Sequence, residues 1–541
     1  MNKTIFLHLF KRNVIYALLI IGCFLTSCSS KNLSSCKNKS VLRINLCDDP
    51  LSWDPRSVRL VKDVTLISHL FEGLTRRDEV GNIENGIAEE ICISEDKKTY
   101  KIYLKKAFWS NGEVITAYDF KASWLQVLQS NFSSFYSHFM DIIKNGRNIR
   151  LQKMEEGNFG VKVLSNRVLL VELERPYPYF KELLSLPVFF PVHESLRNSV
   201  QEDKIVFPLI SNGAFRLVHW QPRFNIKLEK NPYYWETSKV NLKYIDMSII
   251  ADSATEVLLF EKKNLDWLGQ PWSSSILSEA REKLTNQIKS YNVLGTFGLL
   301  VNVETFPLNN VKLRKALSLA LNKESIIKYL LKGNQFIAST FLPKPLSYLS
   351  EDFLDTQFNI VIARKLFEEA LKELGLTKDD LSQITLIYPS SNPRCSAIAQ
   401  EIQQQWKKHL NFLINLKGFE YRYFLEKRNQ GAYHISTANW NAEYTDPLAL
   451  LQILSDDTFI QRYTKWKNEE FLKLIDDAKK EVDDKKRHKL IKQAEKILYE
   501  ELPILPLYHS SFDYALSEDI KGAIFYSSGV VNLNYITFRK L

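Results

Sequence analysis

The chain has 541 residues, which is too long for one ordinary hydrophobic core, so two or three domains are expected. Its hydrophobic fraction of 45% and charged fraction of 25% are those of a soluble globular protein. The net charge of +10 gives no support for nucleic-acid binding, because six of the cations lie in residues 1–40, which hold no acid, and the remainder carries only +4.

The N-terminus has the pattern of a targeting segment. A basic stretch that ends at Arg12 precedes an apolar run over residues 14–25, which has the length of the hydrophobic part of a signal peptide and is too short to cross a bilayer comfortably. The run leads into Leu25-Thr26-Ser27-Cys28, which resembles the bacterial lipobox. This resemblance implies a signal peptide over residues 1–27 and a lipid on Cys28.

Residues 28–40, which are rich in Ser, Lys and Asn, predict a flexible tether between the lipid and the body. Cys23 ends a weaker match to the same lipobox pattern, because cleavage there shortens the apolar core. The alternative is an N-terminus that anchors the chain without cleavage. In either case the body is expected outside the cytoplasm, in the periplasm or at the cell surface, held at a bacterial membrane.

The remaining cysteines suit neither zinc nor a dense disulfide framework, because no C-x-x-C pair occurs. They are Cys36, Cys47, Cys92 and Cys395. One disulfide is open in an oxidising compartment, but buried or free thiols are the favoured interpretation. The nine histidines show no paired metal spacing, and no cofactor is expected.

The first half of the body reads mainly as strands with a few capped helices. Alternating or short apolar runs predict strands near residues 41–46, 100–104, 168–173, 215–218, 226–228, 244–250 and 299–302. Helices are predicted at 64–74, after Thr116 with Asp119 as a capping-box partner, and after Asn310.

The second half alternates more regularly between helix and strand. Helices are predicted at 360–374, 396–409, 421–429 and 471–501, and strands at 384–388, 412–416, from His434 and after Leu502. This alternation predicts an α/β layer arrangement with a mainly parallel sheet. The charged 471–501 region is interpreted as a solvated outer face.

The stretch from His434 to Pro447 carries the candidate binding group. Its first half predicts a short strand, and Asp446 with Pro447 predicts a helix start. Between them lies Glu443, flanked by Trp440 and Tyr444. A carboxylate among aromatic rings at a strand end can receive a cationic ligand group. The alternative is that Glu443 is a solvated loop acid and Trp440 a core residue.

Landmarks along the whole body resemble one family, the oligopeptide-binding proteins of ABC importers, which are the OppA-like members of the extracytoplasmic solute-binding family 5. They are Trp53-Asp54-Pro55, Leu70 to Leu74, Phe108 to Trp124 with Asn111 where Asp is usual, Gly213 to Leu217, Asn231 to Trp235, Arg314 to Leu317, and Pro503 to Tyr508. Each is weak alone, and their number and order carry the resemblance.

The resemblance implies a two-lobed periplasmic-binding-protein clamp (type II, cluster C) with an extra inserted subdomain. The implied segments are lobe I at 41–71, 209–295 and 506–541, the inserted subdomain at 72–208, and lobe II at 296–505. The implied function is a monomeric, lipid-anchored receptor that binds short peptides and delivers them to the permease subunits of an ABC importer.

The resemblance also places Glu443 on the motif whose acid binds the α-ammonium group of the peptide, although Asp is more usual there. Its neighbours Trp440 and Tyr444 belong to the same motif. Backbone at Asn439 and Asn441 is expected to pair with the peptide as an added strand, as is backbone near Val61.

Two departures from the family pattern alter the charge of the site. Arg59 stands where the family carries a second acid near the peptide N-terminus, and Thr437 stands where it carries an arginine that meets the carboxylate of short peptides. They keep open the same fold with a specialised solute: a dipeptide, a cell-wall peptide, a metal chelate or haem. A surface interaction lipoprotein is a further alternative. No nucleophile elbow, phosphate loop or dinucleotide motif supports an enzyme.

Overall fold

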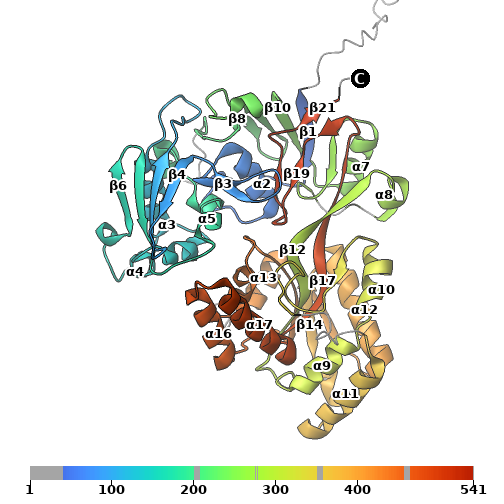
Figure 1. Cartoon of the computed structure of the whole chain (residues 1–541). Helices are drawn as coiled ribbons and strands as arrows, with labels where there is room; N and C mark the ends of the chain where they lie inside the picture. The colour runs from blue at the N-terminus through green and yellow to red at the C-terminus, as the bar shows by residue number, and fades with distance from the viewer. Residues whose placement is uncertain are drawn as a thin grey trace, which may run out of the picture. The chain divides into compact units, whose positions relative to one another are not determined.

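Three sheets organise the chain in the computed structural model (Figure 1). The structure describes residues 40–199, 207–273, 276, 278–349, 358–390, 392–455 and 463–539. Residues 40–537 form one compact unit. The predicted lipidation site Cys28 and most of the tether therefore lie outside the described residues.

The first sheet has four strands in the order β1-β10-β9-β8. Its strands are β1 (Val41–Leu46), β8 (Phe215–Gln221), β9 (Asn225–Lys230) and β10 (Tyr244–Ile249). β1 lies parallel to β10, and the other neighbours are antiparallel. Leu42, Ile44 and Leu46 are buried, as the alternation predicted.

The second sheet is antiparallel and runs β4-β5-β7-β6. Its strands are β4 (Ala88–Ile93), β5 (Thr99–Leu104), β6 (Val161–Ser165) and β7 (Val168–Glu172). Helix α3 (Ala117–Val127) begins at the predicted capping box, in which the backbone N–H of Thr116 donates to the Asp119 carboxylate at 2.8 Å. Trp124 anchors this helix, because its indole N–H donates to the carbonyl of Phe189 at 2.8 Å.

The third sheet has seven strands and joins segments far apart in the sequence. It runs β11-β17-β12-β16-β14-β15, with β13 beside β17. The strands are β11 (Trp267–Gly269), β12 (Ile288–Val301), β13 (Phe336–Ile337), β14 (Thr385–Pro389), β15 (Asn415–Phe419), β16 (Ile435–Asn441) and β17 (Ile504–Leu516). Helices α9 (Val311–Leu319), α11 (Ile360–Leu374) and α12 (Pro393–Leu410) contribute buried side chains to the core beside this sheet.

The prediction of a mainly parallel sheet is wrong. β14 is parallel to β15 and β16, which follow intervening helices as a parallel crossover requires. The two long strands β12 and β17 pair antiparallel with each other along most of their length, and β12 is antiparallel to β16. The alternation of helix and strand therefore predicted the parallel pairing correctly only for β14, β15 and β16, which the intervening helices connect.

Several helices begin or end where a local sequence signal predicted. α11 ends at Gly375, which has φ of 66°, and α13 (Tyr421–Asn429) has the predicted bounds. Asn310 caps α9 by accepting the backbone N–H of Leu313. The other elements are β2 (Thr75–Arg77), β3 (Ile83–Asn85), α4 (Gly146–Arg150), α5 (Phe180–Leu183), α6 (Glu194–Ser199), α7 (Ser253–Glu261), α8 (Ser278–Lys283), α10 (Lys323–Ser325), α14 (Leu448–Leu451), β18 (Ile520–Lys521), β19 (Ile524–Phe525), β20 (Val531–Asn532) and β21 (Thr537–Phe538).

The first helix departs from its prediction over 64–74. α2 spans Val61–Leu70 and ends four residues earlier than expected. The carbonyl of Leu70 accepts the backbone N–H groups of Asn212 and Gly213 at 3.1 and 2.7 Å. These contacts with a distant segment accompany the change to extended backbone at Phe71, which no local signal announces.

The charged region near the C-terminus is two helices rather than one. α16 (Glu469–Lys480) and α17 (Asp484–Glu501) are separated at 481–483, and the Asp483 carboxylate caps α17. The charged faces are exposed, as interpreted, but one face of each helix is buried through Phe471 and Ile475 and through Ile491 and Leu498.

Three of the family landmarks pack against one another in the interior of the protein. The Glu72 carboxylate accepts the hydroxyl of Tyr234 at 2.5 Å and the indole N–H of Trp235 at 2.6 Å. Gly213 lies against the end of α2, where a Cβ atom would be 2.5 Å from the carbonyl oxygen of His69. The landmarks therefore pack residues 70–74, 213–217 and 231–235 together.

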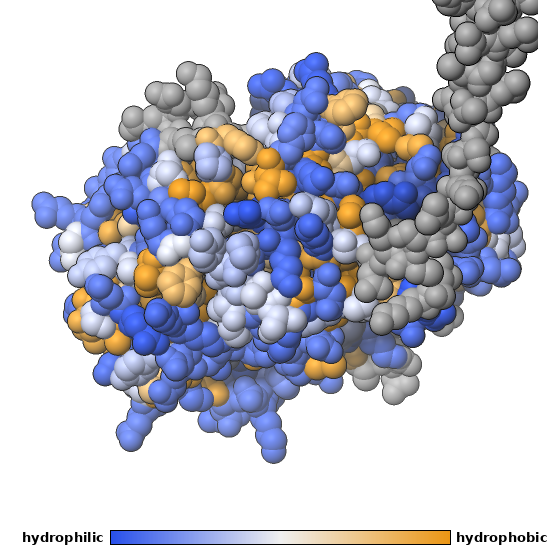
Figure 2. All heavy atoms as spheres, turned by 90° about the horizontal axis from the view of Figure 1, so that it is seen from above, coloured by the Kyte–Doolittle hydropathy of each residue, from blue (hydrophilic) through white to orange (hydrophobic). Residues whose placement is uncertain are grey.

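The surface is predominantly hydrophilic. In the face shown in Figure 2, hydrophobic atoms form several separate areas among charged and polar ones. Such scattered apolar exposure is ordinary for a globular protein. Among the described residues, no helix combines the length and apolar character that crossing a membrane requires.

Candidate functional site

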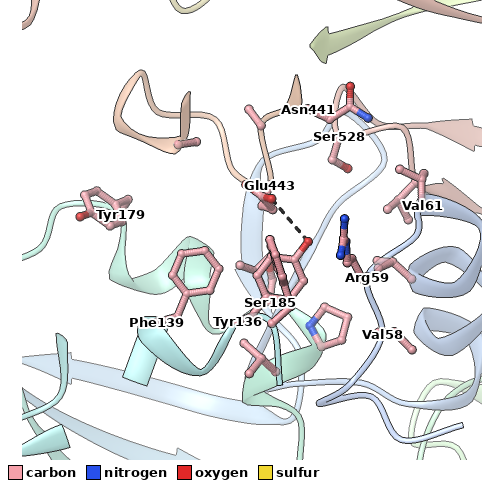
Figure 3. A pocket seen from close by; sticks show the side chains of 18 of the residues that line it. Val58, Arg59, Val61, Tyr136, Phe139, Tyr179, Ser185, Asn441, Glu443 and Ser528 are labelled. Atoms are coloured by element: carbon pink, nitrogen blue, oxygen red, sulfur yellow. Dashed lines mark hydrogen bonds between the residues drawn. The ribbon is translucent and has the colours of Figure 1, made fainter. Parts of the chain in front are cut away.

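A cavity of about 730 Å³ is lined mainly by residues within 58–77, 135–147, 175–190 and 439–455 and by the segment that contains β20. The lining includes Arg59 and Val61 near the start of α2, Tyr136 and Phe139 from the η1 segment (Ser137–Ile142) and its N-cap, and residues 439–443 at the end of β16. Its volume lies in the range of about 300–1,000 Å³ usual for ligand pockets. Figure 3 shows these side chains converging on one space.

The end of β16 offers an open strand edge to this cavity. On one side β16 pairs with β12 from Ile435 to Asn441, without a break. On the other side it pairs with β14 only at Ile435 and Ser436. In the described part of the chain, no strand covers that second edge from Thr437 to Asn441. An uncovered edge presents N–H and C=O groups that can pair with an extended ligand.

Glu443 lies just beyond this edge, where β16 gives way to a loop. The backbone N–H of Ala442 donates to the carbonyl of Leu294 at 2.7 Å, which ties the start of the loop to β12. The Glu443 carboxylate accepts a hydrogen bond from the Tyr136 hydroxyl at 3.4 Å (Figure 3). Burial raises the pKa of Glu443 from its ordinary value to about 7.

Tyr136 responds to the same surroundings. Its burial and the neighbouring Glu443 charge raise the pKa of its hydroxyl, so the phenol stays protonated and acts as a donor to the carboxylate. A ligand ammonium at Glu443 would supply the opposite charge that this half-buried carboxylate lacks. The site is therefore chemically suited to a cation held beside the open strand edge.

Trp440 and the two asparagines lie at the strand edge. Trp440 lines the cavity and packs against Phe341 with a ring-centroid distance of 5.3 Å. The Asn439 amide N–H donates to the Asn441 side-chain oxygen at 3.3 Å, and the Ser510 hydroxyl donates to Asn439 at 3.1 Å. These contacts hold the strand end without using its open backbone edge.

Tyr444 and Thr437 are not among the residues that line the cavity. The buried Tyr444 ring stacks on Tyr179 at a centroid distance of 5.0 Å and meets Phe139 edge-on at 6.1 Å. Thr437 is buried with its side chain hydrogen-bonded to Cys395. The structure thus brings together six of the eight residues predicted for the peptide site and places these two behind it.

Arg59 and Val61 lie on the opposite wall. Val61 is the first residue of α2 and lines the cavity. Arg59 is exposed, and its guanidinium carbon lies 4.7 Å from the centroid of the Phe135 ring. In Figure 3 the Arg59 side chain reaches toward Tyr136.

The sequence did not predict the aromatic wall formed by Tyr136, Phe139 and Tyr179, nor the further arginines of the lining, which include Arg147 and Arg428. The aromatic run over residues 132–139 was the available signal. It has no helical or strand period, because it lies in a turn followed by the short η1 segment. Among the described residues no cluster of three His, Cys, Asp or Glu side chains could hold a metal ion.

An open strand edge and a charged anchor facing a cavity, in an α/β chain of this topology, define a two-lobed solute-binding protein. The sequence model for bacterial extracellular solute-binding proteins, family 5 Middle, matches residues 82–461. The chain belongs to this family of extracellular solute-binding proteins.

Relatives cover nearly the whole chain. The oligopeptide-binding protein OppA of Bacillus subtilis is 32% identical over 537 residues, which are 97% of this chain and 98% of that protein. The dipeptide-binding protein DppE of the same organism is 29% identical over 538 residues, with 95% and 96% covered. The crystal structure of a periplasmic oligopeptide-binding protein (OppAIV) from Borrelia burgdorferi matches with a TM-score of 0.81 and 26% identity, covering 93% of this chain and all of that one.

Proposed function

We propose that this protein is an extracytoplasmic receptor that binds short oligopeptides and delivers them to an ABC importer, without a catalytic role of its own. The observation that carries the proposal is the open edge of β16, which runs from Thr437 to Asn441 and is followed by the Glu443 carboxylate. Main-chain pairing recognises what all peptides share, and one carboxylate recognises the free α-ammonium group.

The relatives support this function. One is named for oligopeptide binding and another for dipeptide binding, and each covers almost the entire chain. A cavity of about 730 Å³ also leaves room for side chains of different sizes with bridging water. A receptor for mixed peptides needs this tolerance, because its affinity must come mainly from the backbone.

The domain arrangement that we propose follows the family. Lobe I comprises 41–71, 209–295 and 506–541, residues 72–208 form its inserted subdomain, and lobe II comprises 296–505. β12 and β17 run through residues 296 and 505, so the two lobes would be joined by these paired strands. Closure about them would enclose the peptide and present the closed form to the importer.

We further propose that residues 1–27 are a signal peptide, that Cys28 carries the lipid, and that the mature protein is a monomer on a flexible tether. The apolar run over 14–25 and the lipobox-like residues 25–28 support this. The lipid would hold the receptor at the membrane that contains the permease subunits.

The first test is native mass spectrometry of the protein purified without added ligand. Co-purified masses that match short peptides of mixed sequence would establish a broad peptide receptor and give the preferred length, including a dipeptide preference. A single recurring non-peptide mass would overturn the proposal in favour of a specialised solute. An empty protein would be titrated with free and N-acetylated peptides, and equal affinity for the two would remove the ammonium contact.

The second test is the Glu443→Gln variant. Loss of the charge-assisted contact should weaken peptide binding by about 1.5–3 kcal/mol. The matched control is Glu155→Gln, which changes an exposed acid outside the cavity lining. Unchanged affinity in Glu443→Gln would exclude Glu443 as the ammonium partner, whereas lost affinity in both variants would point to a general charge effect.

A further inference from the structure

Arg59 is a cavity residue whose charge is not balanced by a neighbour. It lines the cavity and is exposed, and its guanidinium group lies over the Phe135 ring at 4.7 Å. No carboxylate of a described residue forms an ion pair with it. The cation–π contact orients the group without neutralising it.

Other arginines of the cavity have acid partners. Arg76 donates to Glu84 and Glu236 at 2.7 Å each, and Arg77 is bonded to Glu182. These pairs are structural, because each charge is neutralised by its partner within the protein. Arg59 therefore differs from these two arginines of the same cavity, whose charges are already neutralised.

The remaining charge of the cavity is positive. Within the described residues, Arg147 and Arg428 also line the cavity without a carboxylate partner. Arg428 is held between aromatic rings, 5.4 Å from the ring centroids of both Phe424 and Tyr463. Glu72 and Asp141 also line the cavity, but they pair with Arg76 and Arg150. This leaves Glu443 against the three guanidinium groups, so a ligand with more than one negative group is favoured electrostatically.

Arg59 and the proposed ammonium site at Glu443 both lie near the hydroxyl of Tyr136. The Tyr136 hydroxyl is 3.4 Å from the Glu443 carboxylate, and the positive charge of Arg59 acts on the same hydroxyl, opposing the rise in its pKa. In Figure 3 Arg59 and Glu443 lie on two sides of Tyr136. A group bound at Arg59 is therefore close to a group bound at Glu443, one or two residues along an extended peptide.

We propose that Arg59 selects peptides that carry an acidic side chain at their first or second position. The inference rests on the proposed peptide-binding function and adds a sequence preference to it. Glu443 holds the α-ammonium group, and the planar Arg59 guanidinium donates two parallel N–H hydrogen bonds to the side-chain carboxylate of the same peptide. The ammonium group of the ligand thus meets Glu443, and the acidic side chain of the ligand meets Arg59 on the facing wall of the site.

Calorimetric titration with matched peptides tests this preference. The probes are tri-alanine and tripeptides with Glu, Gln or Lys substituted in turn at positions one to three, and the proteins are wild type, Arg59→Ala, Arg59→Glu and the control Arg422→Ala. Arg422 is exposed and lies outside the cavity lining. Wild type and the control should bind Glu about tenfold more tightly than Gln at the first or second position and equally at the third.

The variants should remove and then invert this preference. Arg59→Ala should bind Glu and Gln peptides alike, and Arg59→Glu should favour Lys over Gln at the same position. Equal binding of Glu and Gln peptides by wild type would overturn the inference, as would a Glu preference that survives in Arg59→Ala.

The outcomes also separate this inference from the proposed function. Tri-alanine binding with no Glu preference would retain the receptor and remove only the role of Arg59. Failure of wild type to bind any peptide, including tri-alanine, would remove the proposed function itself. Glutarate, a dicarboxylate without an amine, serves as a further probe, and binding as tight as that of the Glu peptide would overturn peptide selection in favour of a site for free anions.

Discussion

The Tyr136 hydroxyl donates a hydrogen bond to the Glu443 carboxylate across 307 positions of sequence. It joins the segment before η1 to the loop after β16, and both lie on the cavity. Because the acceptor is half-buried and has a raised pKa, this bond and any bound ammonium group both favour the ionised form of Glu443. The charge of the site is therefore coupled to its occupancy.

The first prediction concerns pH. With a pKa of about 7, Glu443 in the empty site is largely protonated at pH 6 and largely ionised at pH 8. An ammonium group binds the ionised form and lowers this pKa, so binding releases a proton below pH 7, and peptide affinity should fall about sixfold from pH 7.5 to pH 6. Calorimetry across pH 5.5–8.5 measures this directly.

Above about pH 7.5 the trend should reverse, because the free α-amino group of a peptide has a pKa of about 7.7–8.0 and loses its charge. The Glu443→Gln variant should lack the decline below pH 7 but retain the decline above pH 8. An affinity for wild type that is constant from pH 6 to pH 8 would contradict the assignment of Glu443 to the ammonium group.

The second prediction is that Tyr136→Phe weakens binding mainly by changing the titration of Glu443. Loss of the donated hydrogen bond removes a contact that favours the carboxylate, so the pKa of Glu443 should rise and the midpoint of the affinity–pH curve should move up. At pH 7 the affinity should fall several-fold, and at pH 8 by less. A uniform loss at every pH would instead indicate a packing role for the phenol.

Glu443 could be found from sequence because its signals are local. A β-branched strand, a carboxylate among aromatic residues and a helix-start pair occur within fourteen residues, and β16 with the loop after it follows this order. The predicted helix start agrees less closely with the structure. Helix α14 spans only Leu448–Leu451, and its N-cap is Pro447, although the Asp446 carboxylate does accept the backbone N–H of Leu448. Tyr136 has no comparable local signal, since its partner lies 307 positions away.

The same distinction explains the fold. The Thr116 capping box and the Gly375 C-cap depend on residues three or four positions apart, and both elements begin or end where the sequence predicts. The end of α2 depends on hydrogen bonds from Asn212 and Gly213, and β12 extends to Ile288 because β17 pairs with its polar first half. Such long-range pairing cannot be read from periodicity.

The third prediction contrasts two changes at Tyr444. Its hydroxyl has no hydrogen-bond partner in the described part of the structure, so Tyr444→Phe should leave stability and peptide affinity nearly unchanged. Tyr444→Ala removes the ring that stacks on Tyr179 and should cost about 3–5 kcal/mol of unfolding free energy. Urea unfolding of both variants measures this difference. Equal destabilisation by the two would show that the hydroxyl, and not the ring, is the stabilising group.

The last prediction concerns the N-terminus. If Cys28 carries the lipid, Cys28→Ala should abolish incorporation of labelled palmitate, whereas Cys23→Ala should retain it, because cleavage before Cys23 would shorten the apolar core of the signal. The mass of the mature wild-type protein should correspond to a chain that begins at Cys28 with attached acyl groups. Labelling that depends on Cys23 would move the cleavage site, and an unlabelled chain that begins at Met1 would establish an uncleaved anchor. Peptide affinity of the Cys28→Ala protein should equal that of wild type, because the described lining of the cavity is formed by residues between Val58 and Asn534.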